Sequence, residues 1–362
     1  LFLGTLNRPA PYCPDAHGKG IAVFEFDPDT GDGRLLSLTE GIDNPTYLSF
    51  DPRRSCLYAT SEVYGPEQGT ATAYHFDPSS ARLRLVNSQP TLGGIAAHNS
   101  LSSDGRFLLV ANYGDGAARQ RTQQAVSVLP IRDDGGLGAP CGWIAHQGTG
   151  PNAARQEGPH AHCAVTSPDS RFVIVADLGI DALPCHRLQA DGSLAADPAP
   201  LRLPPGSGPR HLAFHPSRHF IYAINELSST IAALEYDGAG RLSLIETVPA
   251  APPAAGQENY PADLHVHPDG RFLYGSNRGH DSIAIHAIDG ASGRLALIGH
   301  QPCGGRIPRS FAIDPAGRWL FAANQESDIV ALFRIDPRDG TLADSGCRLE
   351  VGTPMCVICS PG

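Results

Sequence analysis

The segment from Gly208 to Glu226, GPRHLAFHPSRHFIYAINE, carries the pattern that decides the fold. Its apolar residues alternate up to a His-Pro turn, and a second apolar run then begins at Phe220 and is followed by Asn225. Alternation with a period of two is typical of a half-buried strand, and turn residues between two such runs indicate a reversal of the chain. The segment therefore predicts two antiparallel strands joined by a tight turn.

The same unit recurs along the chain at intervals of about 50 residues, close to the roughly 40 to 50 residues that four short strands occupy in one propeller blade. A split copy has its first half in TPMCVICSPG at the C-terminal end and its second half in LFLGTLNR at the N-terminal end. The complete copies begin at Asn44, Ala96, Gly158, Gly208, Tyr260 and Ile307.

Each copy is followed by further β-branched runs with Gly turns, as in DSIAIHAIDGASGRLALIGH from Asp281. The sequence predicts an all-β fold: a seven-bladed β-propeller of four-stranded antiparallel blades, whose ring is closed by the N- and C-terminal strands sharing one blade. We expect residues 1–362 to form a single domain. The 40 Gly and 32 Pro agree with many chain reversals and argue against long helices.

Composition excludes several classes of function. The chain has no run of about 18 apolar residues, so we expect no transmembrane helix. A net charge of −10 argues against nucleic-acid and anionic-membrane partners. The single lysine, Lys19, makes Schiff-base catalysis a poor candidate. Nine cysteines without zinc-type spacing are typical of reduced thiols and predict a cytoplasmic protein, although the start at Leu1 leaves a removed signal peptide open.

Two rings of side chains are expected around one mouth of the central channel. The start of the first strand and the end of the second share a face of each blade, because these strands run antiparallel. The first ring contains Thr46, Ala97, His162, Arg210, Ala262, Arg309 and Met355, with His98 next to Ala97. The second ring contains Arg8, Glu62, Tyr113, Leu178, Glu226, Arg278 and Gln325.

The cationic and titratable members of these rings point to a small anionic ligand, which Arg recognises well. His162, Arg210, Glu226 and Arg278 differ from most of their equivalents in other repeats, and this makes them the strongest candidates. Long connections on the same face are typical of segments that line a site. They comprise residues 9–19, 64–70, 114–124, 146–157 and 250–259.

A metal site is the weaker interpretation. His160 and His162 are spaced to point to the same side of one strand and could join His98 around a cation. Nearby arginines would repel a cation, and further ligands with a diagnostic spacing are missing from the sequence. We expect neither a metal nor a cofactor.

Three segments resemble the seven-bladed lactonase family, which includes bacterial 6-phosphogluconolactonases and fungal carboxy-muconate lactonizing enzymes. They are GPHAHCAVTSPDSRFVIVADLGID, GPRHLAFHPSRHFIYAINELSSTIAALEYD and SNRGHDSIAIHAID. The resemblance spans the chain and implies a site of one His, two Arg and one Glu, which map onto His162, Arg210, Arg278 and Glu226. The early blades depart from the family pattern in PYCPDAHGKG and AAHNSLSSDG.

The resemblance implies a lactonase that hydrolyses a small anionic sugar lactone. Glu226 or His162 would activate water, Arg210 would bind the oxyanion or a carboxylate, and Arg278 with Arg309 would hold a phosphate or carboxylate tail. The other expected substrate-binding residues are His160, His98, Glu62 and Arg8. One alternative is a cycloisomerase acting on a muconate-type diacid, and another is a non-catalytic interaction platform. We expect a monomer or a weak homo-oligomer.

Overall fold

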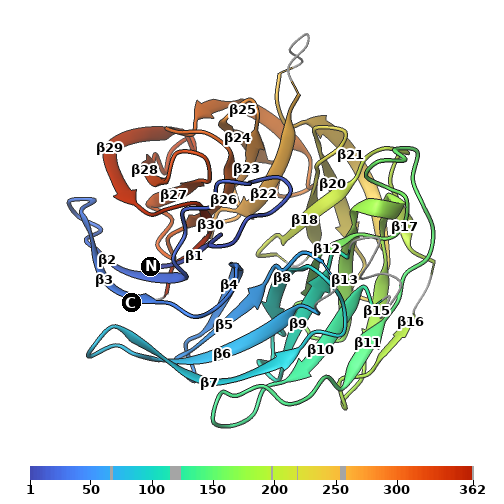
Figure 1. Cartoon of the computed structure of the whole chain (residues 1–362). Coiled ribbons are helices and arrows are strands. Elements are labelled where there is room, and N and C mark those ends of the chain that lie inside the picture. Colours follow the sequence, from blue (N-terminus) through green and yellow to red (C-terminus); the bar gives the residue numbers. More distant parts are fainter. Residues whose placement is uncertain (66–67, 115–123, 197–198, 218, 253–257, 361–362) are drawn as a thin grey trace.

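The computed structural model describes residues 1–65, 68–114, 124–196, 199–217, 219–252 and 258–360. Its strands form seven antiparallel sheets arranged in a ring (Figure 1). This confirms the predicted seven-bladed propeller. Among the described residues, no helix has the length and apolar character needed to cross a membrane.

Blades one to six follow one another along the chain, and a seventh, the closing blade, joins its two ends. Blades one to three contain β4 (Pro45–Asp51), β5 (Cys56–Ser61), β6 (Thr70–Asp77) and β7 (Arg82–Pro90); β8 (Ala96–Leu101), β9 (Phe107–Asn112), β10 (Val126–Pro130) and β11 (Gly142–Ile144); and β12 (Ala161–Thr166), β13 (Phe172–Asp177), β14 (Ala182–Leu183), β15 (Cys185–Leu188), β16 (Leu194–Ala196) and β17 (Leu201–Arg202). Blades four to six contain β18 (Pro209–Phe214), β19 (Phe220–Asn225), β20 (Thr230–Tyr236) and β21 (Leu242–Pro249); β22 (Tyr260–Val266), β23 (Phe272–Arg278), β24 (Ser282–Ile288) and β25 (Leu295–Pro302); and β26 (Pro308–Ile313), β27 (Trp319–Asn324), β28 (Ile329–Ile335) and β29 (Leu342–Glu350). The closing blade contains β30 (Pro354–Ile358), β1 (Phe2–Thr5), β2 (Ile21–Phe26) and β3 (Gly33–Thr39).

The closing blade has the predicted split composition. Its strand order is β3-β2-β1-β30, so the C-terminal strand is the innermost one. Phe2 pairs with Ile358, and Leu3 pairs with Val357. The chain therefore closes its own ring through backbone hydrogen bonds between its two ends.

Apolar side chains fill the space between neighbouring blades. Trp319 on β27 is completely buried between blade six and the closing blade. Its ring meets Phe26 edge-on at a centroid distance of 5.3 Å, and its indole Nε1–H donates to the Pro28 carbonyl at 2.9 Å. Contacts of this kind hold the closing blade to the rest of the ring.

Blade three departs from the four-stranded prediction because its two outer strands are each divided. β14 and β15 are separated by Pro184, which has no N–H to donate and so interrupts a ladder. The Pro184 carbonyl still accepts the Val175 N–H at 2.9 Å, which keeps the divided strand attached to β13. A 3₁₀ turn, η1 (Leu178–Ile180), follows β13 and fills the position of a tight turn.

The innermost strand of every blade carries an irregularity near its start. In blade four, Pro209 pairs with Asn225 and His211 with Ile224, so Arg210 has no partner in the ladder. A bulge of this type leaves one residue unpaired and changes the direction of its side chain. The residues skipped in this way are Thr46, Ala97, His162, Arg210, Ala262–Asp263, Arg309 and Met355. They coincide with the first predicted ring.

The two tryptophans offer a test of how the ring is closed. Trp319→Ala should lower the free energy of unfolding by about 3–5 kcal/mol, because it removes a large, completely buried side chain from the contact with the closing blade. Trp143→Ala is the matched control: Trp143 is 51% exposed on β11, and its loss should change stability by less than about 0.5 kcal/mol. Urea denaturation measures both values, and equal losses would contradict this account of closure.

Candidate active site

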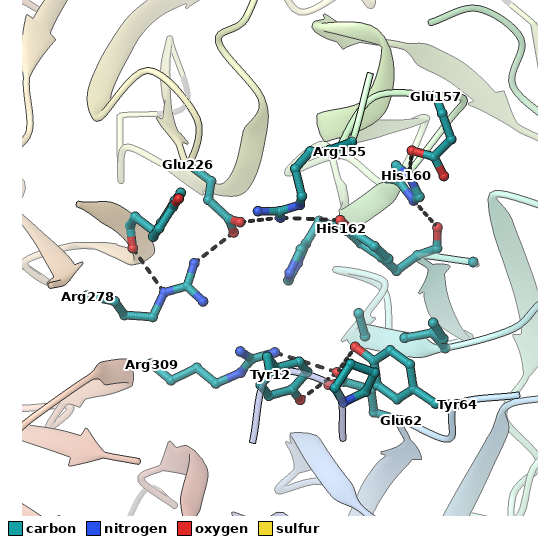
Figure 2. Close-up of a pocket in the computed structure, with 17 residues that line it drawn as sticks. Tyr12, Glu62, Tyr64, Arg155, Glu157, His160, His162, Glu226, Arg278 and Arg309 are labelled. Carbon is teal, nitrogen blue, oxygen red and sulfur yellow. Dashed lines mark hydrogen bonds and ion pairs between the residues drawn. The ribbon is translucent and has the colours of Figure 1, made fainter. Parts of the chain in front are cut away.

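One cavity of about 610 Å³ opens at the mouth where the two predicted rings meet. Its wall takes side chains from every blade, and the ring members Glu62, His162, Glu226, Arg278 and Arg309 all line it (Figure 2). Figure 2 shows two groups of polar side chains on opposite sides of the cavity, with open space between them. One group surrounds Glu226 and the other surrounds Glu62.

The Glu226 cluster consists of Glu226 and three arginines, Arg155, Arg210 and Arg278. Arg155 Nη2 donates to Glu226 Oε1 at 2.5 Å, and Arg278 Nη2 donates to Oε2 at 2.8 Å. Arg210 Nε lies 3.1 Å from Oε2 in an ion pair. Burial alone would raise the pKa of Glu226, but the three guanidinium charges outweigh burial and hold this pKa well below its usual range.

Local backbone structure positions this cluster. Glu226 directly follows β19, and its N–H donates to the Gly208 carbonyl at 2.7 Å, beside the bulged Arg210. Gly208 has a φ of 60°, in the left-handed region that favours glycine, and a Cβ there would meet the Leu227 side chain at 2.4 Å. Arg278 ends β23, and its Nε donates to the Tyr260 carbonyl at 2.9 Å.

The Glu62 cluster consists of Glu62, Tyr12, Tyr64, Thr46 and Arg309. Glu62 Oε1 accepts the Tyr12 hydroxyl at 2.7 Å and the Tyr64 hydroxyl at 3.2 Å, and Oε2 accepts the Thr46 hydroxyl at 2.8 Å. The Arg309 guanidinium lies 4.5 Å from the centre of the Tyr12 ring, in a cation–π contact. Its Nη2 is 3.6 Å from Glu62 Oε1, too far for a hydrogen bond. Arg309 and Glu62 thus form an ion pair, and no described residue accepts a hydrogen bond from the Arg309 guanidinium, so its N–H groups can donate to a ligand.

His162 lines the cavity as a neutral imidazole. It is 5% exposed, and burial together with the positive charge of Arg210 lowers its pKa well below 6.5. Its ring meets Tyr113 and His211 edge-on, with centroid distances of 5.6 and 5.3 Å. Its Nδ1 is buried and has no hydrogen-bond partner among the described residues. Because His162 lines the cavity as a neutral imidazole, it can accept a proton from a ligand or a water molecule.

The remaining predicted site residues lie in different places. His160 lines the cavity, where its ring stacks on Tyr113 at 4.3 Å and its Nδ1 lies 2.9 Å from the Tyr113 carbonyl oxygen. His98 lies deeper in the channel, with Nε2 3.4 Å from Cys163 Sγ. Arg8 is not brought to the cavity: its half-exposed side chain pairs with Asp43 at 2.8 Å.

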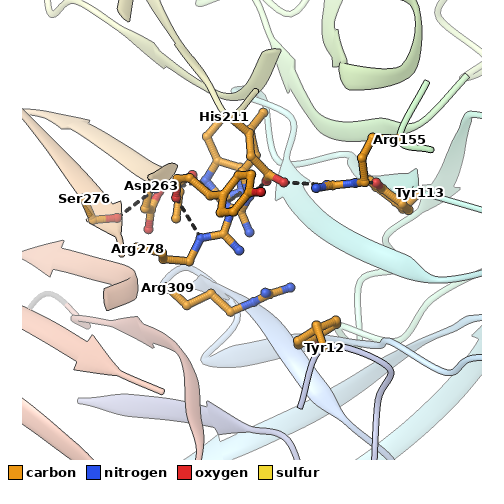
Figure 3. A network of polar contacts seen from close by, with 12 residues as sticks. Tyr12, Tyr113, Arg155, His211, Asp263, Ser276, Arg278 and Arg309 are labelled. Atoms are coloured by element: carbon orange, nitrogen blue, oxygen red, sulfur yellow. Dashed lines mark hydrogen bonds and ion pairs between the residues drawn. The ribbon is translucent and has the colours of Figure 1, made fainter. Parts of the chain in front are cut away.

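Arg210 belongs to the floor of the site. It is 3% exposed, lines a void of about 10 Å³ below the main cavity, and donates from Nη1 to the Ala262 carbonyl. The same Nη1 lies 3.3 Å from His211 Nε2, and His211 Nδ1 lies 2.8 Å from Asp263 Oδ1 (Figure 3). The channel thus holds a buried row of polar groups under the Glu226 cluster.

Sequence reasoning did not single out Arg155, Tyr12 or Tyr64. Each lies in one of the long connections predicted to line the site, but none occupies a repeat position that could be compared between blades. Parts of three such connections, residues 66–67, 115–123 and 253–257, lie outside the described residues. In the ranges that are described, no group of three or more His, Cys, Asp and Glu side chains is placed to hold a metal ion.

The fold and the cavity agree with the class of protein found by comparison. Residues 1–359 match the family described as "Lactonase, 7-bladed beta-propeller", and the chain belongs to this family.

Relatives with assigned activities are similar over most of the chain. The 6-phosphogluconolactonase of Bacillus subtilis (strain 168) is 37% identical over 294 residues, which cover 81% of this chain and 80% of the relative. The structure of the periplasmic gluconolactonase of Pseudomonas aeruginosa is 36% identical, with a TM-score of 0.87 and coverage of 98% of this chain and 96% of the other. A putative 6-phosphogluconolactonase from Bacteroides uniformis is 34% identical, with a TM-score of 0.88 and coverage of 98% and 97%.

The lowered pKa of His162 has a consequence for stability. Because the folded protein resists protonation of His162 while the unfolded chain does not, this residue destabilises the fold as the pH falls below about 6.5. Between pH 7 and pH 5, the free energy of unfolding should therefore fall further in the wild type than in His162→Gln, and the two losses should differ by up to about 2 kcal/mol. Urea midpoints at the two pH values test this, with the exposed His219→Gln as control. An unchanged pH dependence in His162→Gln would contradict the neutral assignment.

Proposed function

We propose that this protein hydrolyses the ester bond of a small anionic sugar lactone, with 6-phosphogluconolactone as the first substrate to test. The observation that carries this proposal is a neutral histidine, His162, in the same cavity as an excess of arginine charge. The names of the Bacillus subtilis and Pseudomonas aeruginosa relatives support a sugar lactone as the substrate class.

The charges around the cavity favour an anionic substrate. Four arginines, Arg155, Arg210, Arg278 and Arg309, face three carboxylates, Glu62, Glu157 and Glu226. The excess of positive charge suits a phosphate or carboxylate group. Arg309 is the best anchor for that group, because its guanidinium faces the cavity without a hydrogen-bonded carboxylate. Arg278 lies across the cavity from Arg309, next to Glu226 (Figure 2).

In the proposed mechanism His162 acts as the general base. It removes a proton from a water molecule as the water oxygen attacks the lactone carbonyl carbon. Arg278, with Arg210 beneath it, stabilises the negative charge that develops on the carbonyl oxygen. When the tetrahedral intermediate collapses, the ring C–O bond breaks, and the proton held by His162 passes to the leaving oxygen. The product is the open hydroxy acid.

Glu226 is a poorer general base than His162, although the sequence alone does not decide between these two residues. Its two carboxylate oxygens already accept or face three guanidinium groups, and its pKa is held well below the usual range. A carboxylate of such low basicity takes a proton from water inefficiently. Its proposed task is to hold Arg210 and Arg278 in place, because an unpaired array of buried arginines would repel itself.

The cysteines and the closed ring bear on the cellular compartment and the oligomeric state of the protein. We propose a cytoplasmic protein: all nine cysteines are free, and burial raises the pKa of Cys163 and Cys356 to about 12, which keeps these thiols protonated. The Pseudomonas aeruginosa relative is named as periplasmic, and cell fractionation distinguishes the two compartments.

We also propose a monomer or weak homo-oligomer, because one chain closes its own ring. Analytical ultracentrifugation measures the oligomeric state.

The role of His162 can be tested by kinetics. His162→Asn should lower kcat for 6-phosphogluconolactone by at least about 100-fold with a small change in KM, because it removes the base but leaves the arginines. The exposed His219→Asn serves as the control. A kcat for His162→Asn close to the wild-type value would show that another group activates water. The same reaction followed by NMR in D₂O should place no deuterium on carbon; its appearance there would favour a cycloisomerase.

The anchoring role of Arg309 predicts a difference between two substrates. Arg309→Gln should raise KM for 6-phosphogluconolactone at least about 10-fold but leave KM for unphosphorylated gluconolactone within about twofold. Arg334→Gln is the matched control, because Arg334 also stacks on an aromatic ring, 4.1 Å above Trp319, away from the cavity. An equal rise of KM for both lactones would place the anionic group elsewhere.

A further inference from the structure

The three guanidinium groups on Glu226 are held in different ways. Arg210 and Arg278 lie on β18 and β23, and their side chains are 3% and 14% exposed. Arg155 lies in the connection between β11 and β12, and its side chain is 36% exposed. Besides Glu226, its guanidinium reaches the Tyr113 hydroxyl at 3.4 Å. Arg155 is therefore the one member of the Glu226 cluster whose side chain has room to leave.

The backbone beneath Arg155 is fixed. The Arg155 N–H donates to the Asn152 carbonyl at 3.0 Å, and the next residue, Gln156, is completely buried. Gln156 Nε2 donates to the Leu178 carbonyl at 2.8 Å and to Asp181 Oδ1 at 2.7 Å. A change of partner by Arg155 thus requires only rotation about its side-chain bonds, with no movement of the connection.

The charge balance gives Arg155 a reason to change partner. When Arg155 leaves, Glu226 still pairs with Arg210 and Arg278, so its negative charge stays compensated. A phosphate in the cavity offers the freed guanidinium a second anion that accepts two parallel hydrogen bonds. A neutral sugar offers no comparable partner, and Arg155 would then stay on Glu226.

We propose that Arg155 is a specificity-determining residue that pairs with Glu226 in the empty cavity and transfers to the phosphate of a bound phosphorylated sugar lactone. The identity of this ligand depends on the proposed function, whereas the exchange itself does not require turnover. Arg155 thereby adds to the anchoring by Arg309 and favours phosphorylated over neutral lactones.

A double-mutant cycle on ligand binding tests the exchange. The probes are 6-phosphogluconate and gluconate, the open acids that are not themselves hydrolysed, and calorimetry gives their affinities. Arg155→Gln should weaken 6-phosphogluconate binding at least about 10-fold and leave gluconate binding unchanged. Glu226→Gln should strengthen 6-phosphogluconate binding, because Arg155 no longer has to leave a carboxylate. That gain should disappear in the double variant. Arg306→Gln, which breaks an exposed pair with Glu326, is the control and should change neither affinity.

Additive effects of the two substitutions would overturn the proposal, because they would mean that Glu226 acts only through its general electrostatic field. Equal weakening of the binding of both ligands by Arg155→Gln would overturn it as well and indicate a structural role.

If Glu226→Gln does not fold, a crystal structure of the wild type with 6-phosphogluconate tests whether Arg155 changes partner. Arg155 Nη2 should then lie within about 3.2 Å of a phosphate oxygen and more than about 4 Å from Glu226; an intact pair with Glu226 refutes the exchange. Failure of the proposed function has a separate signature, namely wild-type protein that opens no lactone.

Discussion

A single irregularity of the backbone, repeated from blade to blade, creates the conditions for the site. Near its start, the innermost strand contains a residue that is skipped in the ladder. The carbonyl two positions before the skipped residue accepts a hydrogen bond from the N–H of the residue that follows the second strand. These acceptor and donor pairs are Asn44 and Glu62 at 3.0 Å, Ile95 and Tyr113 at 2.8 Å, and Gly208 and Glu226 at 2.7 Å. The accepting residue adopts a positive φ in these blades, even where it is Ile95, for which this conformation costs about 1–2 kcal/mol. The ladder on either side holds this geometry in place, and side chains from six blades are thereby directed to the same mouth.

The chemistry of the cavity follows from which residues occupy these positions. Arg210 and Arg309 occupy bulges, and Arg278 ends a second strand, so three largely buried guanidinium groups are placed around one cavity. Buried charges of one sign are costly unless they are paired. Glu226 and Glu62 supply the pairing, but with different results: Glu226 is fully engaged, whereas Glu62 is occupied mainly by hydroxyl groups. The uneven compensation leaves one side of the cavity more attractive to an anion than the other.

The periodic part of this structure could be predicted from the sequence, and the non-periodic part could not. The recurring hairpin predicted the blades, their closure and the positions of the first ring, because each repeat gives an independent estimate of the same position. The pattern placed Ala97 in the first ring, but it did not reveal that the adjacent His98, expected to bind substrate, does not line the cavity. It also left Glu226 and His162 equal as bases, since their basicity depends on guanidinium groups that come from distant parts of the chain. Arg155 lies in a connection with no equivalent elsewhere, so no comparison between repeats could reveal it.

The shared closing blade also sets an order of events during synthesis. β1 and its inner partner β30 are about 350 residues apart, so at about 5–20 residues per second the ribosome needs roughly 20 to 70 s to supply the partner strand. During that interval the apolar β1 has an unsatisfied inner edge, the kind of segment that holdase chaperones shield. Tyr12, which follows β1, reaches its final place beside Glu62 and Arg309 only after β30 docks. A nascent or truncated chain without β30 would therefore lack a finished pocket, and the protein gains its chemistry only once this strand has been translated.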